Sequence, residues 1–425
     1  MMTSYPSAIK KVQVLLLERL AGIAPKMAPD TTSTADALAT LAVSTPDMKE
    51  DVKPLFTPTR LGDYTLENRM AMAPLTRCRG LNMVPSKAAI TYYTQRAYPG
   101  SLLISEGTPI SQAGQGYPHV PGVYTDEQIE AWKPIVRAVK EKGTIFFMQI
   151  WHCGRVSHSD YQPDGGAPLA PSALRITKGD VYTPKGGPYP FPEPREMTKA
   201  DIAEVIEQFA QGAENAVKKA GFDGVEIHGA NTYLLDEFLK DETNHRTDEY
   251  GGPIENRCRF VLELVKAVVD RVGAGKTGIR FSPFTTYYDC SDSHPYGLFC
   301  YLLEELNKLN LAYVHFVEPR IQGISEAKTA DSLAPFRAVW KGTFLAAGGF
   351  DREKAIKAIE TEHADVIVFG RHWLANPDLP RRFQLDAPLN KYDRDTFYTH
   401  DPVKGYTDYP FLEDVEKSES TKAQD

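Results

Sequence analysis

The sequence predicts a single (β/α)8 barrel, an α/β fold in which eight parallel strands close into a TIM barrel surrounded by helices. From Leu55 onward, short apolar runs rich in β-branched and aromatic residues alternate with longer helical patterns. Runs such as Val366–Phe369 are apolar on both faces, as strands buried in a parallel sheet must be. Eight such runs occur, and each is followed by a helical pattern or by enough chain for one.

The predicted strands and helices follow one another in regular alternation. The strands cover Met70–Pro74, Leu102–Glu106, Thr144–Trp151, Gly224–His228, Thr277–Ser282, Tyr313–Glu318, Phe344–Gly348 and Asp365–Gly370. The helical patterns include Asp126–Lys142, Lys199–Ala220, Glu255–Val272, Gly297–Leu309 and Arg352–Glu360. A doubly wound open sheet is the alternative arrangement. It usually has a glycine-rich turn after its first strand, and residues 73–77 contain no glycine.

The chain divides into three parts. Residues 1–53 are predicted to form an amphipathic helix and a linker, because apolar residues recur at helical spacing, at Ile9, Val12, Leu16, Leu20 and Ile23. Lys10, Lys11 and Arg19 would also suit an organelle-targeting segment, but Glu18 and the scarcity of arginine favour a helix that packs on the barrel or on a partner. Residues 54–412 form the barrel, and residues 413–425 a polar tail.

Two segments interrupt the alternation. Leu55–Glu67 precedes the first strand and is predicted to be a hairpin lid that closes the bottom of the barrel. Asp160–Pro194 is rich in proline and glycine and shows no period, which predicts a long loop above the third strand.

Composition excludes several classes of protein. The chain has 425 residues, of which 42% are hydrophobic and 24% charged, as in an ordinary globular protein. The formal net charge of −8 argues against nucleic-acid binding, and no apolar run is long enough to span a membrane. The five cysteines include no C-x-x-C pair, which indicates free thiols in a reducing, cytoplasmic compartment and no metal site. We expect a monomer or a homodimer.

The active site of such a barrel lies at the carboxyl ends of its strands. The last two strands end in Gly348-Gly349 and Gly370-Arg371. Glycine lets backbone N–H groups approach an anion, and an adjacent arginine can bind the anion through two hydrogen bonds. The pattern favours a phosphate site over two ordinary loop turns.

Other strand ends carry groups suited to a flat, polar ligand. Gln149 and Trp151 share one face of the third strand, and the planar amide of Gln149 suits the edge of a heterocycle. Arg280 lies within an apolar run, where an unpaired charge is costly. The arginine therefore either forms a structural salt bridge or faces an electron-rich cofactor.

The fourth strand is followed by a candidate catalytic group. His228 and Asn231 are three residues apart and would point the same way, so that two neutral donors would meet one oxygen. Tyr233 can reach the same volume and, with an ordinary pKa near 10, would stay protonated and act as a general acid. A lone histidine at a strand end is more often structural. Its neighbours Gln149 and Arg280 favour the functional interpretation.

The same segments resemble the old yellow enzyme family. The resemblance runs in order through roughly residues 54–412, and the ending from Tyr392 to Pro410 is similar to the oxophytodienoate-reductase branch. The segments that carry it are Ala73–Arg77, Tyr92–Arg96, Ile104–Gly107, Gln149–Trp151, His228–Asn231, Asp248–Gly252, Arg257–Phe260, Gly370-Arg371 and Asn376–Leu379.

The resemblance implies an eight-stranded barrel that holds FMN non-covalently and uses NADPH to reduce the C=C bond of α,β-unsaturated carbonyl compounds. It places Pro74, Leu75, Thr76, Gly107, Gln149 and Arg280 around the flavin ring, and Gly348, Gly349, Gly370 and Arg371 at its phosphate. His228 and Asn231 would bind the substrate carbonyl, Tyr233 would protonate the α-carbon, and Tyr117, Trp151 and Tyr398 would line the pocket.

The chain departs from this family at three places. Many oxophytodienoate reductases have a second histidine at the position of Asn231, the family usually has glycine at Thr232, and the loop Thr285–Cys290 is unusual. These changes leave other functions open. The alternatives are a flavin-dependent isomerase or reductase of a secondary-metabolite pathway that uses the same site, a flavin-binding module without turnover, and a barrel that processes phosphosugars.

Overall fold

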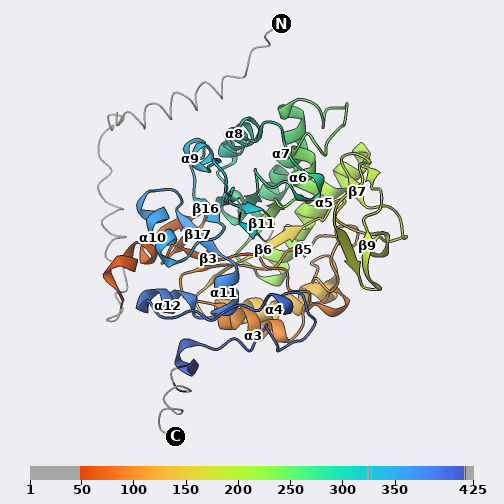
Figure 1. Cartoon of the computed structure of the whole chain (residues 1–425). Coiled ribbons are helices and arrows are strands. Elements are labelled where there is room, and N and C mark those ends of the chain that lie inside the picture. Colours follow the sequence, from red (N-terminus) through yellow and green to blue (C-terminus); the bar gives the residue numbers. More distant parts are fainter. Residues whose placement is uncertain (1–47, 323–324, 327, 416, 418–425) are drawn as a thin grey trace, which may run out of the picture.

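The computed structural model describes residues 48–322, 325–326, 328–415 and 417. Eight parallel strands form a closed barrel, because β17 pairs with β3 and β6 pairs with β11 (Figure 1). Its strands are β3 (Met70–Met72), β4 (Leu102–Ile104), β6 (Ile145–Trp151), β11 (Gly224–Gly229), β12 (Thr277–Phe281), β13 (Tyr313–Val317), β16 (Phe344–Ala347) and β17 (Val366–Phe369). The predicted barrel is confirmed, every predicted strand is present, and the open-sheet alternative is wrong.

Helices surround the barrel. They are α3 (Ala88–Arg96), α4 (Asp126–Lys140), α5 (Lys199–Glu214), α6 (Leu234–Leu239), α7 (Ile254–Val272), α8 (Pro295–Leu306), α9 (Ala334–Val339), α10 (Arg352–Glu360), α11 (Arg371–Ala375) and α12 (Leu379–Leu385). The helix predicted to end at Ala220 is α-helical only to Glu214 and continues as a π-helical turn. Capping boxes begin two of the long helices, at Thr125 for α4 and Thr198 for α5.

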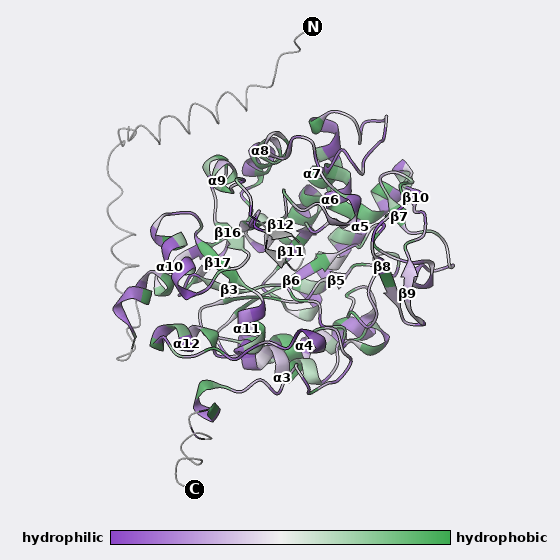
Figure 2. Ribbon diagram, viewed as in Figure 1, coloured by the Kyte–Doolittle hydropathy of each residue, from purple (hydrophilic) through white to green (hydrophobic). Residues whose placement is uncertain are grey.

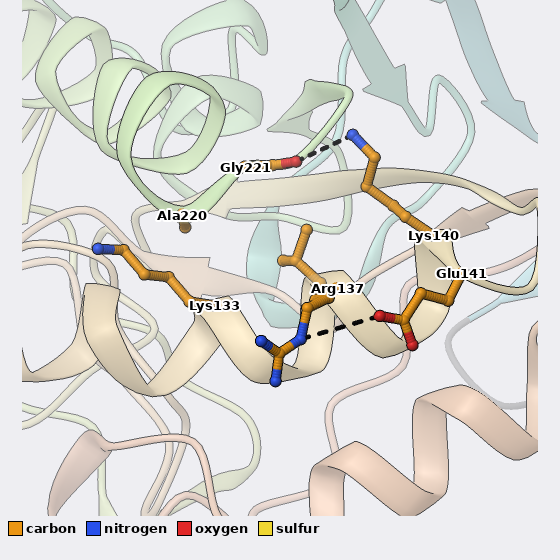
Figure 3. A pocket seen from close by; sticks show the side chains of 7 residues that line it. Lys133, Arg137, Lys140, Glu141, Ala220 and Gly221 are labelled. Atoms are coloured by element: carbon orange, nitrogen blue, oxygen red, sulfur yellow. Dashed lines mark hydrogen bonds and ion pairs between the residues drawn. The ribbon is translucent and has the colours of Figure 1, made fainter.

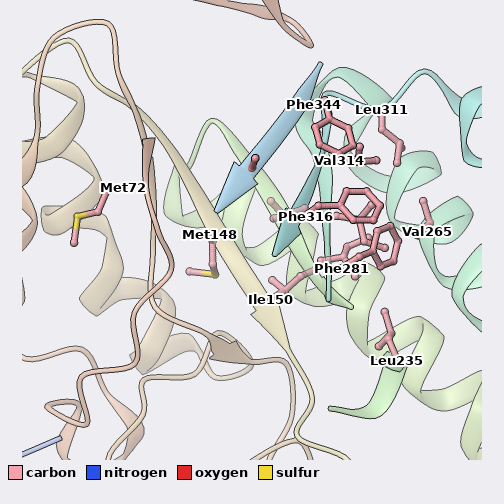
Figure 4. Packing of buried hydrophobic residues seen from close by; sticks show 14 of the residues in the cluster. Met72, Met148, Ile150, Leu235, Val265, Phe281, Leu311, Val314, Phe316 and Phe344 are labelled. Atoms are coloured by element: carbon pink, nitrogen blue, oxygen red, sulfur yellow. The ribbon is translucent and has the colours of Figure 1, made fainter. Parts of the chain in front are cut away.

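The strands bury both faces, as their continuous apolar sequences require. On β13, Val314 and Phe316 face the helices, where they pack with Phe281 and Phe344 (Figure 4). The alternate residue Tyr313 belongs to a second apolar cluster, which also holds Leu345 and Val368 of neighbouring strands. Figure 2 accordingly colours strands such as β3 and β17 as hydrophobic, whereas the outer helices carry both colours.

The predicted hairpin lid is present and closes the amino ends of the strands. It consists of β1 (Thr59–Leu61) and β2 (Tyr64–Leu66), which pair antiparallel. The Tyr64 hydroxyl donates to the carbonyl of Asp223 at 2.8 Å, just before β11, and Asp63 N–H donates to the Gly275 carbonyl at 3.1 Å, before β12. Leu61 and Leu66 are fully buried in the interior cluster.

The insertion Asp160–Pro194 is more regular than predicted. It contains β7 (Leu169–Ala170), which pairs with β10 (Arg195–Glu196), and a hairpin of β8 (Asp180–Thr183) and β9 (Gly186–Pro190). The aperiodic pattern was misleading because β9 buries none of its residues, and its register is irregular. The hairpin is instead tied to the chain before it, where the Tyr161 hydroxyl donates to the Tyr182 carbonyl at 2.6 Å.

The two terminal predictions fall largely outside the described residues. The proposed amphipathic helix lies within residues 1–47, and most of the polar tail lies beyond residue 417. Within the described part, the chain begins with a 3-10 helix over Glu50–Phe56, whose Asp51 pairs with Arg352 of α10 at 2.6 Å. None of the described helices is long and apolar enough to cross a membrane.

A glycine inside the barrel gives a test of this packing. A Cβ added at Gly278 of β12 would lie less than 3.0 Å from three carbons of the Tyr313 ring. We therefore expect Gly278→Ala to destabilise the protein by about 1–3 kcal/mol, since well-packed interiors tolerate added volume poorly. Urea denaturation would measure the free energy of unfolding. Gly166→Ala is the matched control, because no atom lies within 4 Å of a Cβ there; equal effects of the two variants would contradict the close packing.

Candidate active site

Four predicted site residues form an aromatic cluster above the carboxyl ends of the strands. The Trp151 indole, at the end of β6, stacks on the His228 imidazole of β11 with ring centroids 5.7 Å apart. Tyr233 meets both rings edge-on, at 4.7 and 5.0 Å. Tyr117 stacks on Trp151 at 5.4 Å, and its hydroxyl lies 2.9 Å from that of Tyr233. Side chains from three separate segments therefore converge on one volume.

His228 is a neutral donor in this cluster. The backbone N–H of Ala230 donates to its Nδ1 at 3.4 Å, which assigns the ring proton to Nε2. Burial holds the pKa of His228 well below its ordinary value, and the nearby Arg280 and His315 add to this effect. At neutral pH the ring therefore offers an uncharged N–H to a ligand.

A constrained turn presents Asn231 and Tyr233. Asn231 and Thr232 both have left-handed backbone conformations, with φ of 60° and 68°. Such a conformation is costly for a β-branched residue, whereas the glycine usual in the family adopts it freely. Asn231 N–H donates to the Ser282 hydroxyl at 2.7 Å, and Thr232 N–H donates to the Asp236 carboxylate at 2.9 Å. These bonds offset the strain, and Tyr233 still reaches the cluster.

A buried ion pair supports the turn from below. Lys240 and Asp236 are both fully buried, and their Nζ and Oδ2 atoms lie 2.9 Å apart. The same ammonium donates to the carbonyls of Ser282 and Thr285 at 3.2 and 2.9 Å. The loops after β11 and β12 are thereby fastened together.

The Tyr233 phenol is kept in its protonated form. Burial raises the pKa of its phenol well above the ordinary 10, and the neighbouring phenols Tyr117 and Tyr287 add to this effect. The hydroxyl therefore remains protonated throughout the neutral range and can donate.

Beneath the cluster lies a layer of polar side chains that fills the barrel interior. The Gln149 amide donates to Glu226 at 2.8 Å, and the other Glu226 oxygen lies 2.8 Å from Nδ1 of His315. Arg280 lies on β12, between His228 of β11 and His315 of β13 in register. Glu226 attracts the Arg280 guanidinium, although no ion pair of Arg280 is found among the described residues.

Glu226 and His315 were not among the predicted site residues. A signal for them was available, because a strand has a period of two, and Glu226 therefore shares the inward face of its strand with His228. The same rule places His315 beside Tyr313 on the inward face of β13.

The predicted phosphate-binding residues lie together on neighbouring strands. Gly348 and Gly349 follow β16 with φ of 130° and 65°, and Gly370 follows the adjacent β17 and precedes α11. The Gly348 carbonyl accepts two hydrogen bonds from Arg320, at 2.9 and 2.5 Å. The Arg371 guanidinium lies over the Tyr392 ring at 5.3 Å.

The remaining predicted residues surround this region less closely. Pro74 is buried and Leu75 and Thr76 are half-buried in the loop after β3. Gly107 faces the Trp151 indole, where a Cβ would lie 2.6 Å from a ring carbon. The Tyr398 side chain is 57% exposed, and its described ring contact is with Phe397 and not with the aromatic cluster.

Two buried nitrogens show that this region fits a flat, anionic cofactor. Arg280 Nε and Trp151 Nε1 are buried and have no hydrogen-bond partner among the described residues. Buried donors are normally paired, so unpaired donors at a strand end point to a ligand. The cation of Arg280, the amide of Gln149 and the glycines after β16 and β17 match a flavin ring and its phosphate.

A shallow hollow elsewhere on the molecule does not belong to this site. Figure 3 shows it between α4 and Gly221, lined by Lys133, Arg137, Lys140 and Glu141. Lys140 donates to the Gly221 carbonyl at 3.2 Å and pairs with Asp223 at 2.7 Å, and these groups precede β6 and β11. The hollow therefore lies at the opposite end of the strands.

The thiols and histidines supply no metal centre in the described part of the chain. All five cysteines are free and buried. His152 is fully buried beside Cys153, and its Nδ1 accepts from Gly154 N–H at 3.1 Å.

The buried His152 should make the free energy of unfolding depend on pH. Burial lowers the pKa of His152 from 6.5 to about 3, so the unfolded chain binds a proton below pH 6.5 that the folded protein excludes. The stabilisation is complete above pH 6.5 and is lost as pH falls toward 3. We expect the stability advantage of the wild type over His152→Gln to shrink by about 2 kcal/mol between pH 8 and pH 5. Urea denaturation at both pH values measures it, and a constant difference would contradict the neutral state.

The comparisons with known proteins decide the family. The model of the NADH:flavin oxidoreductase / NADH oxidase family matches residues 54–390. The chain belongs to this family. The predicted membership of the old yellow enzymes is thereby confirmed, and the protein is a flavin oxidoreductase. The phosphosugar and non-catalytic alternatives lose their basis.

Individual members of the flavin oxidoreductase family are similar over nearly their whole length. 12-Oxophytodienoate reductase 1 of Oryza sativa subsp. japonica is 53% identical over 373 residues, which are 87% of this chain and 96% of that protein. 12-Oxophytodienoate reductase 2 of Arabidopsis thaliana is 49% identical over 365 residues, 85% of this chain and 96% of that protein.

Solved structures agree. Morphinone reductase superposes with a TM-score of 0.81 at 44% identity, covering 85% of this chain and 97% of that one. The old yellow enzyme homologue from Zymomonas mobilis gives a TM-score of 0.80 at 41% identity, with coverages of 84% and 99%.

Proposed function

We propose that the protein is an FMN-dependent, NADPH-consuming reductase of the C=C bond in α,β-unsaturated carbonyl compounds. The meeting of His228 and Tyr233 in one aromatic cluster, on either side of the turn that carries Asn231, is the observation that carries this proposal. Relatives named 12-oxophytodienoate reductases favour a cyclic enone as the substrate class.

The proposed cofactor site uses the residues already described. Gln149 and Arg280 would hold the polar edge of the flavin, and Pro74, Leu75, Thr76 and Gly107 would surround the ring. Gly348, Gly349, Gly370 and Arg371 would hold the phosphate. When bound, FMN would supply the redox chemistry, the transfer of a hydride equivalent from NADPH to the β-carbon of the enone.

The chain's own side chains act on the substrate carbonyl and on the α-carbon. His228 Nε2–H and the Asn231 amide donate to the carbonyl oxygen, where negative charge develops as the β-carbon gains hydride. The side chain of Asn231 has no hydrogen-bond partner among the described residues, so its amide is available for this role. Trp151 and Tyr117 would line the substrate site, and the exposed Tyr398 would line its outer edge.

Tyr233 completes the reduction by giving its phenolic proton to the α-carbon. Tyr117 holds the Tyr233 hydroxyl from the side, through the hydrogen bond of 2.9 Å. A protonated phenol at this place favours net reduction over an isomerase, which returns the hydride without delivering a proton to the product.

An absorption spectrum tests the cofactor, and substrate turnover tests the reaction. We expect purified protein to show the visible flavin bands and to release FMN on denaturation. We also expect it to oxidise more than one equivalent of NADPH under anaerobic conditions only when an enone such as cyclohexenone is added. A protein without flavin bands after addition of FMN would refute the cofactor, and flavin reduction without enone consumption would refute the reaction.

A further inference from the structure

The buried carboxylate of Glu226 has no role in the reaction described above. Building on the proposed function, we propose that Glu226 is a positioning residue that fixes the Gln149 amide and lowers the reduction potential of the bound flavin by partly cancelling the charge of Arg280.

Glu226 joins three strands of the barrel at one level. It is fully buried on β11, accepts from the Gln149 amide of β6 at 2.8 Å, and lies 2.8 Å from Nδ1 of His315 on β13. Both oxygens are thus engaged, as an ionised buried carboxylate requires.

These contacts determine which way the Gln149 amide points. An ionised carboxylate only accepts hydrogen bonds, so the Gln149 NH2 group must face Glu226. The Gln149 carbonyl oxygen and the second amide hydrogen are left for a ligand. A heterocycle edge that offers an N–H beside a carbonyl, as the pyrimidine part of a flavin does, matches this pair.

The charges in the layer have opposite signs. The groups facing Glu226 are Arg280, Gln149, His315 and Tyr313. His315 has its pKa lowered by burial and is neutral, and burial raises the pKa of Tyr313, so that phenol is neutral too. Burial alone would raise the pKa of Glu226, but the hydrogen bonds from His315 and Gln149 and the positive charge of Arg280 lower it and keep the carboxylate ionised. One positive and one negative charge therefore face each other in this layer.

A flavin gains negative charge when it takes up two electrons as hydride. Arg280 favours that reduced form, and Glu226 opposes it, because Coulomb interactions are strong where water is excluded. Removing the charge of Glu226 leaves Arg280 uncompensated and stabilises the reduced flavin. The reduction by NADPH then becomes more favourable, and the reoxidation by an enone becomes less favourable.

Glu226→Gln removes the charge and keeps the shape. The Gln149 contact survives because the new carbonyl oxygen can accept it. His315 can switch its proton to Nε2, which is buried without a partner in the described part of the chain, and accept from the new amide through Nδ1. If this variant does not retain FMN, the double variant Glu226→Gln/His315→Gln removes the same negative charge. Its two amides can hydrogen-bond to each other in either orientation.

The experiment is a redox-dye titration of the FMN-loaded enzyme, together with the FMN dissociation constant from fluorescence. We expect Glu226→Gln to raise the ratio of reduced to oxidised flavin at a fixed solution potential by about tenfold, which is about 30 mV for a two-electron couple. Glu226→Asp keeps the charge and should keep the wild-type potential, with weaker FMN binding.

Asp365→Asn is the matched control. Asp365 is a carboxylate at the amino end of β17 that pairs with Arg337 at 3.1 Å and accepts from Phe344 N–H at 2.8 Å. Its loss should lower stability and leave the potential unchanged. A Glu226→Gln enzyme with an unchanged or lower potential would overturn the inference, as would an equal shift in Glu226→Asp. A wild type that binds no flavin would instead refute the proposed function.

Discussion

Replacing Tyr233 with Phe is expected to slow the oxidation of the reduced enzyme by an enone by about 10²–10⁴-fold, the usual contribution of a positioned general acid. The variant removes only the hydroxyl, so the edge-on contacts with Trp151 and His228 remain. Reduction of the enzyme by NADPH needs no proton from Tyr233 and should keep its rate. Stopped-flow absorbance of the two half-reactions, with NADPH and with cyclohexenone, measures both rates.

Tyr161→Phe is the matched control for Tyr233→Phe. It removes another buried hydroxyl, which donates to the Tyr182 carbonyl and not to the site. Both half-reactions should be unaffected. If Tyr233→Phe reduced the enone at the wild-type rate, another acid would deliver the proton.

The raised pKa of Tyr233 also predicts how the enone half-reaction responds to pH. Because this pKa lies well above 10, the wild-type enone half-reaction should not decline as pH rises from 6 to 9. A decline with a midpoint in that range would show that the proton comes from a group with a lower pKa than Tyr233.

The barrel could be predicted because its strands obey a strong local constraint. A strand such as Val366–Phe369 is covered by helices outside and by other strands' side chains inside, so every residue is apolar. The constraint is much weaker on β8 and β9, because β8 buries only Val181 and Thr183 and β9 buries none of its residues. Their hairpin is held by hydrogen bonds to Tyr161 and Asp160. An aperiodic, glycine-rich sequence therefore concealed a regular element.

The positions of the candidate site residues could be predicted where these residues stand at strand ends, and not where distant loops hold them. His228, Gln149 and Arg280 lie on the strands themselves, and their places follow from the fold. The burial of Lys240 has no such local signal. Its ammonium binds carbonyls 42 and 45 residues further along the chain, which only the closed barrel brings near.

Removing either proposed donor to the substrate carbonyl should have an effect nearly as large as the loss of Tyr233. We expect His228→Ala and Asn231→Ala each to lower kcat/KM for cyclohexenone by about 10²–10³-fold, as for other groups that stabilise a developing oxyanion. The visible flavin bands should remain. His158→Ala is the matched control, since His158 lies in the chain just before the insertion, where its Nδ1 accepts from the Asp160 backbone N–H.

The double variant His228→Ala/Asn231→Ala tests whether the two residues donate to the same carbonyl oxygen or act independently. If His228 and Asn231 donate to one oxygen, their effects are coupled, and the double variant should lose less than the product of the two single losses.

The neutral state of His228 also makes a prediction about pH. Its pKa is depressed by burial and by Arg280, so kcat/KM should stay level from pH 6 to 8. A cationic donor with an ordinary pKa near 6.5 would instead lose activity progressively above that pH, and such a profile would show that the imidazolium binds the enone.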